Sequence, residues 1–362
     1  MNKIDNFIIA EAGSNHNGDV RKAQDLIDIA YKAKADSIKF QLIFADGLYL
    51  PEYPADGGYI KSKVFEKRLK EEFTSEEWFA IWDYAREVGI DISGSVFCSR
   101  GVSLLKELGC TYVKIASTDL TNHKLIREVC TSFDTVVMST GMASIQEVSA
   151  SVACAMAANV NVNLKLMHCV SLYPCRFEEA KISRINALKS AFNIEVGYSD
   201  HTNDARSAIL AWANGATFFE KHFTYDKDQP GFDHAHAQSS EELGLYIETL
   251  KSCEQAMQWC ELYGDNQNAE NVTKIRARRG VYVNKDLLAG HVITKDDLLY
   301  VRPSSEYQSV NPSDFVGLKI MKPLIKYSAI GMNSEIVEVS SNWAKADTYW
   351  NQEMQEKNMD DD

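Results

Sequence analysis

Short apolar runs alternate with longer amphipathic stretches through the first two-thirds of the chain. The runs are largely continuous rather than alternating, which is typical of parallel strands covered on both faces. The eight runs are Phe7–Ala10, Ser37–Gln41, Asp91–Ser95, Thr111–Ile115, Thr135–Met138, Leu164–His168, Ile194–Gly197 and Thr217–Glu220. Between them, stretches such as Ala23–Ala30 place apolar residues at helical spacing, and Thr74–Glu77 offers a capping signal before Trp78.

Eight strand-then-helix units within about 260 residues predict an α/β fold, a closed (β/α)8 TIM barrel. An open, doubly wound sheet is the alternative, but no G-x-G-x-x-G motif follows the first strand. After a long helical stretch at Glu241–Leu262, short strand-like runs appear at Val281–Val283, Ile293–Thr294 and Leu298–Val301. We therefore predict a barrel at 1–263, a polar linker at 264–276, a small β-rich module at 277–339 and an acidic tail at 340–362. A module of about 60 residues is near the lower limit for independent stability, so we expect it to dock on another surface.

Composition and charge narrow the range of partners. The 362 residues include 51 acidic and 38 basic side chains, a formal charge of −13, which argues against a nucleic-acid partner or an anionic membrane surface. No apolar run approaches the roughly 20 residues that a membrane span needs, and no secretion signal opens the chain. The eight cysteines are scattered without a C-x-x-C pair, which favours reduced thiols and a cytoplasmic location.

Polar residues follow every predicted strand. Barrel active sites are built from residues just past the carboxyl ends of the strands, so these side chains are expected to share one cavity. In chain order they are Glu11, Lys39, Gln41, Ser95, Lys114, Ser117, Asp119, Ser139, Thr140, His168, Ser171, Tyr173, Ser199, Asp200, His201, Glu220, Lys221 and His222.

Two pairs within this set indicate specific chemistry. His201 and His222 end neighbouring strands, where two imidazoles could share one divalent cation such as Mn²⁺, Zn²⁺ or Fe²⁺. Lys39 and Lys114 end inward-facing strands, and because buried lysines are costly unless paired, they imply an anionic ligand. No G-x-x-x-x-G-K-[ST] loop is present, so a nucleoside triphosphate is not expected, and the sequence around Ser199 does not match a serine-hydrolase elbow.

Motifs along the chain resemble the sialic acid (N-acetylneuraminate) synthase family, in collinear order from about residue 7 to residue 335. The barrel segments that carry the resemblance are Ile8–Gly18, Ile38–Gln41, Val113–Asn122, Met138–Met142, Leu166–Cys169, Gly197–Thr202, Glu220–Thr224 and Pro230–Asp233. Arg278–Gly280, Lys285–Asp286, Gly290 and Val301–Pro303 resemble the antifreeze-like (SAF) module that closes those enzymes. The resemblance predicts a TIM barrel followed by an SAF domain.

The resemblance implies condensation of phosphoenolpyruvate with an N-acylated hexosamine, giving a nine-carbon 2-keto sugar acid and phosphate. His201 and His222 would ligate the metal, most simply Mn²⁺, with Mg²⁺ or Co²⁺ as substitutes. The residues that would act in catalysis are Glu11, as the manager of a proton, together with Lys39, Lys114 and Asp119. Those that would bind the two substrates are Gln41, Ser95, Ser117, Ser139, Ser171, Tyr173, Ser199 and Asp233, and Arg302 would reach into the partner's barrel across a domain-swapped homodimer.

The chain departs from the family pattern mainly at the sugar end. Ser95-Val96-Phe97 replaces a usual Thr-Pro-Phe, Ser171 replaces Asn, Asp119 replaces Glu, and Pro303-Ser304-Ser305-Glu306 replaces Pro-Gly-x-Gly. These changes favour a non-standard acceptor, such as a diacetamido sugar on the route to legionaminic- or pseudaminic-type acids. Two other functions stay open: a metal-dependent barrel aldolase or hydrolase acting on another phosphorylated sugar, and a barrel that binds a sugar without turnover.

Overall fold

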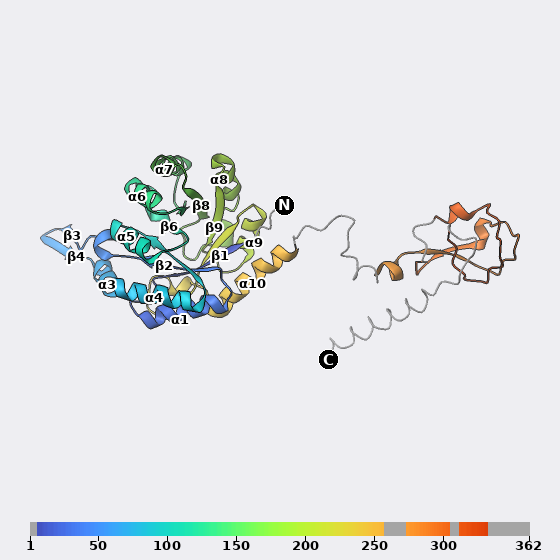
Figure 1. Cartoon of the computed structure of the whole chain (residues 1–362), viewed down its shortest axis with the longest axis horizontal. Helices are drawn as coiled ribbons and strands as arrows, with labels where there is room; N and C mark the ends of the chain where they lie inside the picture. Colours follow the sequence, from blue (N-terminus) through green and yellow to red (C-terminus); the bar gives the residue numbers. More distant parts are fainter. Residues whose placement is uncertain (1–5, 257–272, 305–310, 332–362) are drawn as a thin grey trace. The chain divides into compact units, whose positions relative to one another are not determined.

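The computed structural model describes residues 6–256, 273–304 and 311–331. The chain forms two compact units, Met1–Gln258 and Trp259–Asp362 (Figure 1), and each is considered by itself. Most of the predicted linker and all of the predicted acidic tail lie outside the described residues.

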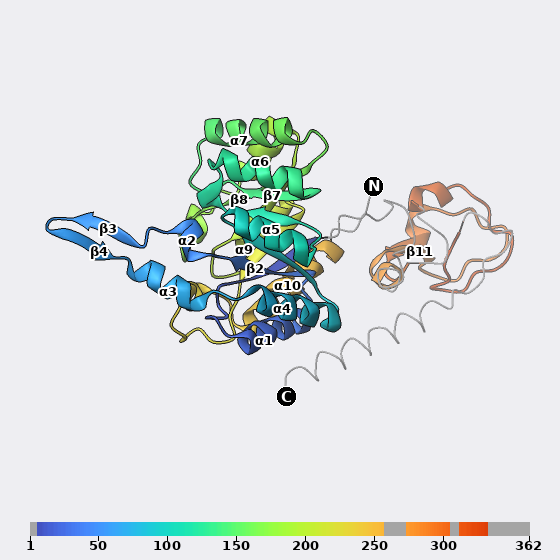
Figure 2. The ribbon, with the colours of Figure 1, turned by 60° about the vertical axis from the view of Figure 1, so that its left-hand side comes forward.

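Eight parallel strands close into a barrel in the first unit (Figure 2). Their order around the barrel is β1-β10-β9-β8-β7-β6-β5-β2. The strands are β1 (Phe7–Gly13), β2 (Ser37–Leu42), β5 (Asp91–Val96), β6 (Val113–Ile115), β7 (Thr135–Ser139), β8 (Asn163–Cys169), β9 (Glu195–Asp200) and β10 (Phe218–His222). Each of the eight predicted runs forms one of them. The TIM-barrel prediction is therefore confirmed.

Amphipathic helices surround the barrel. They are α1 (Val20–Lys32), α4 (Ser75–Val88), α5 (Ser99–Leu108), α6 (His123–Ser132), α7 (Ile145–Ala158), α8 (Arg184–Phe192), α9 (Arg206–Ala213) and α10 (Ser240–Ala256). Helix α4 begins with the predicted capping box, in which Thr74 and Glu77 satisfy each other's backbone N–H groups. It ends at Gly89, whose left-handed backbone (φ 86°) stops the helix.

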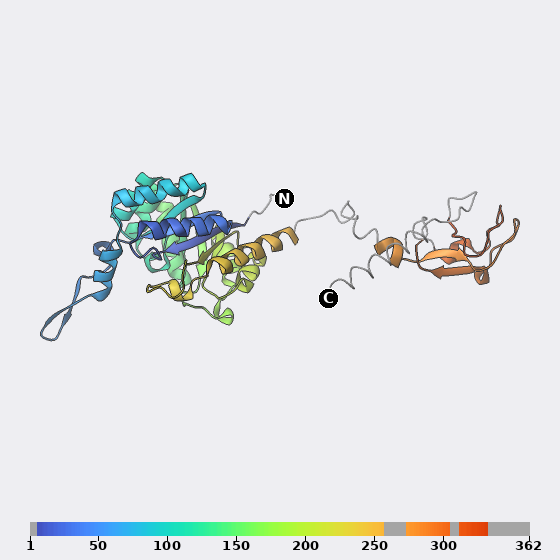
Figure 3. The same ribbon diagram turned by 90° about the horizontal axis from the view of Figure 1, so that it is seen from below.

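An insertion between β2 and β5 interrupts the regular alternation. It consists of α2 (Ala45–Leu48), the antiparallel hairpin β3 (Glu52–Ala55) and β4 (Gly58–Lys61), and α3 (Lys63–Glu71). The hairpin extends away from the barrel (Figure 3), and its residues are exposed. No sequence pattern predicted these elements, because strands without a buried face lack the apolar runs that mark a strand.

The barrel interior changes from apolar to polar along its length. Ile9, Tyr112, Val137, Met167 and Phe218 form one buried cluster. On β10, side chains alternate between the two faces, so Phe218, Glu220 and His222 point inward while Phe219 and Lys221 point outward. The carboxyl-end half of the interior is thus lined by charged and polar groups over an apolar base.

The second unit has a small core of its own. Strand β11 (Gly280–Val283) pairs antiparallel with β12 (Leu298–Val301), which confirms two of the three predicted strands. Ile293–Thr294 forms no such strand, and the neighbouring Val292 makes only an isolated bridge to Lys319. The core consists of Val281, Val283, Leu287, Ile293, Phe315, Ile320, Leu324 and Ile330. Short 3₁₀ turns occur at Ser117–Asp119, Phe177–Glu179 and His234–His236 in the first unit, and at Lys295–Asp297 and Pro312–Phe315 in the second.

Candidate active site

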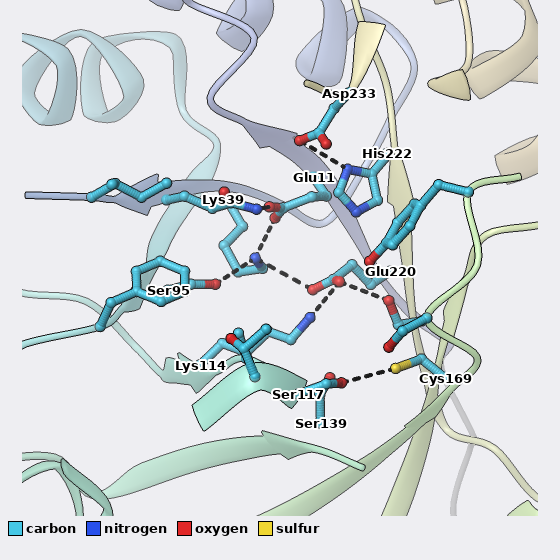
Figure 4. Close-up of a pocket in the computed structure, with 18 of the residues that line it drawn as sticks. Glu11, Lys39, Ser95, Lys114, Ser117, Ser139, Cys169, Glu220, His222 and Asp233 are labelled. Carbon is cyan, nitrogen blue, oxygen red and sulfur yellow. Dashed lines mark hydrogen bonds and ion pairs between the residues drawn. The ribbon is translucent and has the colours of Figure 1, made fainter. Parts of the chain in front are cut away.

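A cavity of about 500 Å³ lies at the carboxyl ends of the barrel strands (Figure 4). All of the residues that the resemblance assigned to catalysis, substrate or metal line it except Asp119 and Arg302. Those that do are Glu11, Lys39, Gln41, Ser95, Lys114, Ser117, Ser139, Ser171, Tyr173, Ser199, His201, His222 and Asp233. Of the other strand-end residues expected in this cavity, Glu220 lines it, whereas Thr140, His168, Asp200 and Lys221 do not. Closure of the barrel therefore brings together side chains that are up to 222 residues apart in the chain.

Two lysines and two glutamates form a buried ionic cluster at the centre of the cavity (Figure 4). Lys39 is paired with Glu11, and its Nζ lies 3.4 Å from Glu220 Oε2 and 2.9 Å from Ser95 Oγ. Lys114 is paired with the other oxygen of Glu220. The register of β1 and β2 creates the first of these pairs, because it places Glu11 opposite Lys39. Buried charges of this kind are tolerated only when they are paired.

The protonation states within this cluster follow from its charges. Burial by itself would lower the pKa of Lys39, but the carboxylates of Glu11 and Glu220 outweigh it and raise that pKa. Burial would likewise raise the pKa of Glu220, and the nearby charges of Lys114 and Lys39 instead hold it well below its usual range. At neutral pH Lys39 is therefore a cation and Glu220 an anion.

One wall of the cavity carries hydroxyl groups and a close backbone approach. Ser117 Oγ accepts a hydrogen bond from the Gly141 N–H at 3.0 Å, and the Ser139 hydroxyl is buried without a partner among the described residues. A Cβ atom at Gly141 would lie 2.5 Å from Ser171 Oγ and 2.7 Å from Ser117 Oγ, so a side chain at this position would displace the hydroxyl groups of the wall. A ligand with several acceptor oxygens, such as a phosphate, fits this wall beside Lys114.

The two predicted metal ligands lie side by side, with ring centroids 5.5 Å apart. His201 Nδ1 is 2.7 Å from the Val170 carbonyl oxygen, which can only accept, so Nδ1 carries the proton and Nε2 keeps its lone pair. Burial, reinforced by the charge of His222, lowers the pKa of His201 to about 3. His222 Nδ1 is 3.7 Å from Asp233 Oδ2. His201 is thus held as the neutral tautomer that binds metals.

Few of the described side chains in the cavity could ligate a metal ion together. In the part of the chain that the structure describes, no group of three or more His, Cys, Asp or Glu side chains is arranged to hold a metal ion. The available lone pair of His201 fits a site in which two imidazoles hold a cation and leave its other positions open. Open positions of this kind are filled by water and substrate in catalytic sites.

Gln41, Tyr173 and Asp233 line another part of the cavity wall. Gln41 Nε2 donates to Glu11 Oε1 at 3.1 Å, and the Tyr173 ring packs 4.1 Å from the His201 ring, centroid to centroid. Burial would raise the pKa of Asp233, but the nearby His236, whose Nε2 lies 3.6 Å from Asp233 Oδ1, and neighbouring positive charge lower it to about 2. A Cβ atom at Gly13, which has a φ of 58°, would come within 2.8 Å of Asp233 Oδ2.

Several predicted residues are placed elsewhere. Thr140 Oγ1 donates to the Met167 carbonyl, and His168 Nε2 is hydrogen-bonded to the Ala180 carbonyl. Asp200 and Lys221 pair with each other on the outer face of the barrel wall, because strand side chains alternate between the two faces.

The Asp119 carboxylate accepts from Thr118 Oγ1 and from Asn122 Nδ2, each at 3.0 Å, within the 3₁₀ turn after β6, and it does not line the cavity. Its catalytic role stays a prediction without a supporting contact. Arg302 lies in the second unit, where its side chain is exposed.

Two charged residues in the cavity wall received no role from the sequence. Glu220 precedes His222 by two positions on β10. Because every second side chain of a strand points to the same face, an inward-pointing His222 predicts that Glu220 also points into the barrel. Arg68 comes from α3 in the insertion, and no strand end pointed to it. Apolar residues, among them Leu48, Tyr49, Phe97 and Met142, complete the wall.

The chain is similar in sequence to synthases of sialic-acid-type sugars, and similar in structure to one of them. The chain is 31% identical over 324 residues to an N,N'-diacetyllegionaminic acid synthase from Legionella pneumophila, covering 87% of this chain and 90% of the relative. It is 30% identical over 325 residues to a pseudaminic acid synthase from Campylobacter jejuni, covering 88% and 93%. A sialic acid synthetase crystal structure from Leptospira borgpetersenii matches with a TM-score of 0.64 and 30% identity, over 74% of this chain and 90% of that one.

Fold and cavity together define a TIM-barrel enzyme with a buried, charged active site. The NeuB family model matches residues 26–261, and the chain belongs to this family. The resemblance to sialic-acid-type synthases that the sequence motifs predicted is confirmed. No helix within the described residues is both long and apolar enough to cross a membrane.

Proposed function

We propose that the protein condenses phosphoenolpyruvate with an N-acylated hexosamine, releasing phosphate and a nine-carbon sialic-acid-type 2-keto acid. The observation that carries the proposal is the cavity itself, where two paired lysines and a hydroxyl-lined wall adjoin two imidazoles. These groups match an anionic enol phosphate on one side and an aldehyde sugar on the other. Membership of the NeuB family supports the same reaction.

The anionic substrate would be held by the hydroxyl wall and the lysines. Ser117 and Ser139 would bind phosphate oxygens, and the buried Ser139 hydroxyl would gain the partner that it lacks among the described residues. Lys114 and Lys39 would neutralise the phosphate and carboxylate charges. Because both lysines are already held by glutamates, they are oriented before the substrate arrives, which reduces the cost of ordering them on binding.

The bonds that form and break in the proposed condensation require a group that takes a proton from water and a group that polarises the aldehyde. The C3 carbon attacks the sugar aldehyde, water adds to the electron-poor C2, and the tetrahedral adduct expels phosphate by cleavage of its C–O bond. Glu11, which is hydrogen-bonded by Gln41 and paired with Lys39, is placed to take the proton from that water. A divalent cation held by His201 and His222, most simply Mn²⁺, would supply a Lewis acid for the aldehyde oxygen.

For the acceptor we propose a diacetamido hexosamine. The sequence departures at Ser95 and Ser171, which line the cavity, support this choice, as do the names of the diacetyllegionaminic and pseudaminic acid synthases among the relatives. We further propose a cytoplasmic enzyme, supported by free cysteines at all seven cysteine positions within the described residues. A domain-swapped dimer, in which an SAF-type module supplies Arg302 to the partner's barrel, completes the proposal.

The first test is phosphate release from phosphoenolpyruvate across a panel of N-acyl hexosamines, with and without Mn²⁺. We expect release to require both an acceptor and the metal, and to be faster with diacetamido acceptors than with N-acetylmannosamine. Release that needs neither acceptor nor metal would contradict the condensation. Sugar binding without any release would instead support the non-catalytic alternative, and equal or better turnover of N-acetylmannosamine would exclude the preference for diacetamido acceptors.

The second test concerns Arg302. Its replacement by Ala is expected to raise the KM for the sugar roughly tenfold while changing the KM for phosphoenolpyruvate by less than about twofold, because a lost contact to the acceptor weakens only acceptor binding. Steady-state kinetics with each substrate varied in turn measures both constants. The exposed Arg279 of the same unit, whose Nη1 donates to Tyr300 O, serves as a matched control. Equal effects on both substrates would argue against a contact between Arg302 and the sugar.

A further inference from the structure

The insertion between β2 and β5 places an arginine in the wall of the cavity. Arg68 on α3 lines the cavity together with Gln41 and Asp233, and only 7% of its surface is exposed. Its Nη1 donates to Ser14 Oγ at 2.8 Å and to Glu71 Oε2 at 3.3 Å. The side chain is therefore fixed in the cavity wall and does not swing freely in solvent.

An aromatic ring fixes the plane of the Arg68 guanidinium. Its Cζ lies 4.0 Å from the centroid of the Phe232 ring, and Phe232 directly precedes Asp233 in the chain. Stacking of this kind leaves the edge of the guanidinium free to donate, because the ring covers only its face.

Several N–H donors of the Arg68 guanidinium make no hydrogen bond to the described residues. The guanidinium carries five N–H groups in a planar fork. Hydrogen bonds to described residues use only Nη1, and Nε is buried without a partner among them. A buried donor that lacks a partner costs free energy until one is supplied. An acceptor oxygen of a ligand in this cavity would supply it.

The charges around Arg68 indicate what kind of oxygen this is. Glu71 lies 3.3 Å from Arg68 Nη1 and 3.7 Å from Lys67 Nζ, and the Asp233 carboxylate belongs to the same wall. These groups carry two positive and two negative charges, so the surroundings offer donors without a net positive charge. A phosphate needs surplus cations, whereas a neutral carbonyl or hydroxyl oxygen needs only the N–H groups.

We infer that Arg68 is a specificity-determining residue, which donates to a neutral oxygen of the acceptor sugar and selects acceptors that are not phosphorylated at that end. The inference rests on the proposed condensation and adds to it a residue outside the strand ends. Asp233 and Glu71 disfavour a phosphate at this position by charge repulsion. Arg68 would contribute to binding of the sugar and not to binding of phosphoenolpyruvate, because the hydroxyl wall and Lys114 provide the phosphate site.

The test compares Arg68→Met with Lys67→Met. Methionine keeps a long apolar side chain over Phe232 but removes every donor, so we expect the KM for an unphosphorylated N-acyl hexosamine to rise about 10- to 100-fold. The KM for phosphoenolpyruvate should change less than about twofold. Lys67 lies beside Arg68 on α3, and its Nζ is 4.3 Å from the centroid of the same ring, but it does not line the cavity. Its replacement should leave both constants within about twofold.

Arg68→Lys separates charge from geometry and also covers the case in which Arg68→Met fails to fold. Lysine keeps the positive charge but lacks the planar fork, so we expect its sugar KM to lie much nearer to that of the Met variant than to the wild type. The wild type should prefer an unphosphorylated hexosamine over its 6-phosphate by at least about tenfold. A preference for the 6-phosphate, or an unchanged sugar KM in folded Arg68 variants, would overturn the inference. Absence of phosphate release by the wild type with every acceptor would instead refute the proposed function.

Discussion

Replacement of His222 by Ala is expected to lower kcat/KM by about 10³-fold or more while the barrel stays folded, and the same holds for His201. A Lewis acid on the aldehyde oxygen is worth several kcal/mol, and each 1.36 kcal/mol corresponds to a tenfold change in rate. Because the proposed site would hold the cation with two imidazoles, loss of either one would leave a single imidazole ligand. Steady-state kinetics measures the loss, and electron paramagnetic resonance of added Mn²⁺ measures binding directly.

His168 provides the matched control for this experiment. It is buried on β8 and its Nε2 is hydrogen-bonded to the Ala180 carbonyl, but it does not line the cavity. His168→Gln is expected to lower stability without weakening Mn²⁺ binding. Chelation should reduce the wild type to the level of the His222 variant, and added Mn²⁺ should restore only the wild type. Normal activity in either variant, or unchanged Mn²⁺ affinity, would remove the metal proposal.

Asp200→Ala is expected to lower the free energy of unfolding by about 3–5 kcal/mol, because it leaves the charge of Lys221 buried without its anion. Both side chains lie on the outer face of the barrel wall, where Lys221 Nζ is 3.5 Å from Asp200 Oδ2 and neither side chain is more than 2% exposed. The Asp200 carboxylate also accepts from the Thr202 N–H and from Ser207 Oγ. The substitution therefore removes partners from several buried donors at once.

Two further variants isolate the ionic contribution. Asp83→Ala breaks the exposed pair with Arg86, whose side chains are 64% and 52% exposed, and is expected to cost less than about 1 kcal/mol. Combining Asp200→Leu with Lys221→Met removes both charges and should recover part of the loss, since apolar pairs can replace buried ion pairs. Urea unfolding followed by circular dichroism measures all three. A double variant less stable than Asp200→Ala would show that the charge of Lys221 is not the cause.

Much of the site was predictable because its signals are local. A parallel strand that is covered on both faces leaves a continuous apolar run, and the barrel places whatever follows each run at one end. Glu11, Lys39 and His222 could therefore be assigned to one cavity before any contact was known. Asp119 followed the same rule but does not line the cavity, because a short turn after β6 engages its carboxylate with Thr118 and Asn122.

Other features depend on contacts between distant parts of the chain. The pairing of Lys114 with Glu220 joins residues 106 positions apart and follows from how the barrel closes and from the direction of each side chain. The tautomer of His201 depends on the carbonyl of Val170, a residue on the preceding loop. Arg68 reaches the cavity only because α3, which belongs to an insertion that no sequence pattern predicted, contributes to the cavity wall.

The sequence by itself therefore determined the barrel, the end of it that carries the chemistry, the family and most of the residues in the cavity. These follow from periodicities and motifs that span a few residues, because the apolar pattern of each strand shows which of its faces are buried. The tertiary structure decided the partners of each charge, the protonated nitrogen of His201, and the entry of Arg68 into the wall. Those depend on the register and closure of all eight strands, which no short segment encodes.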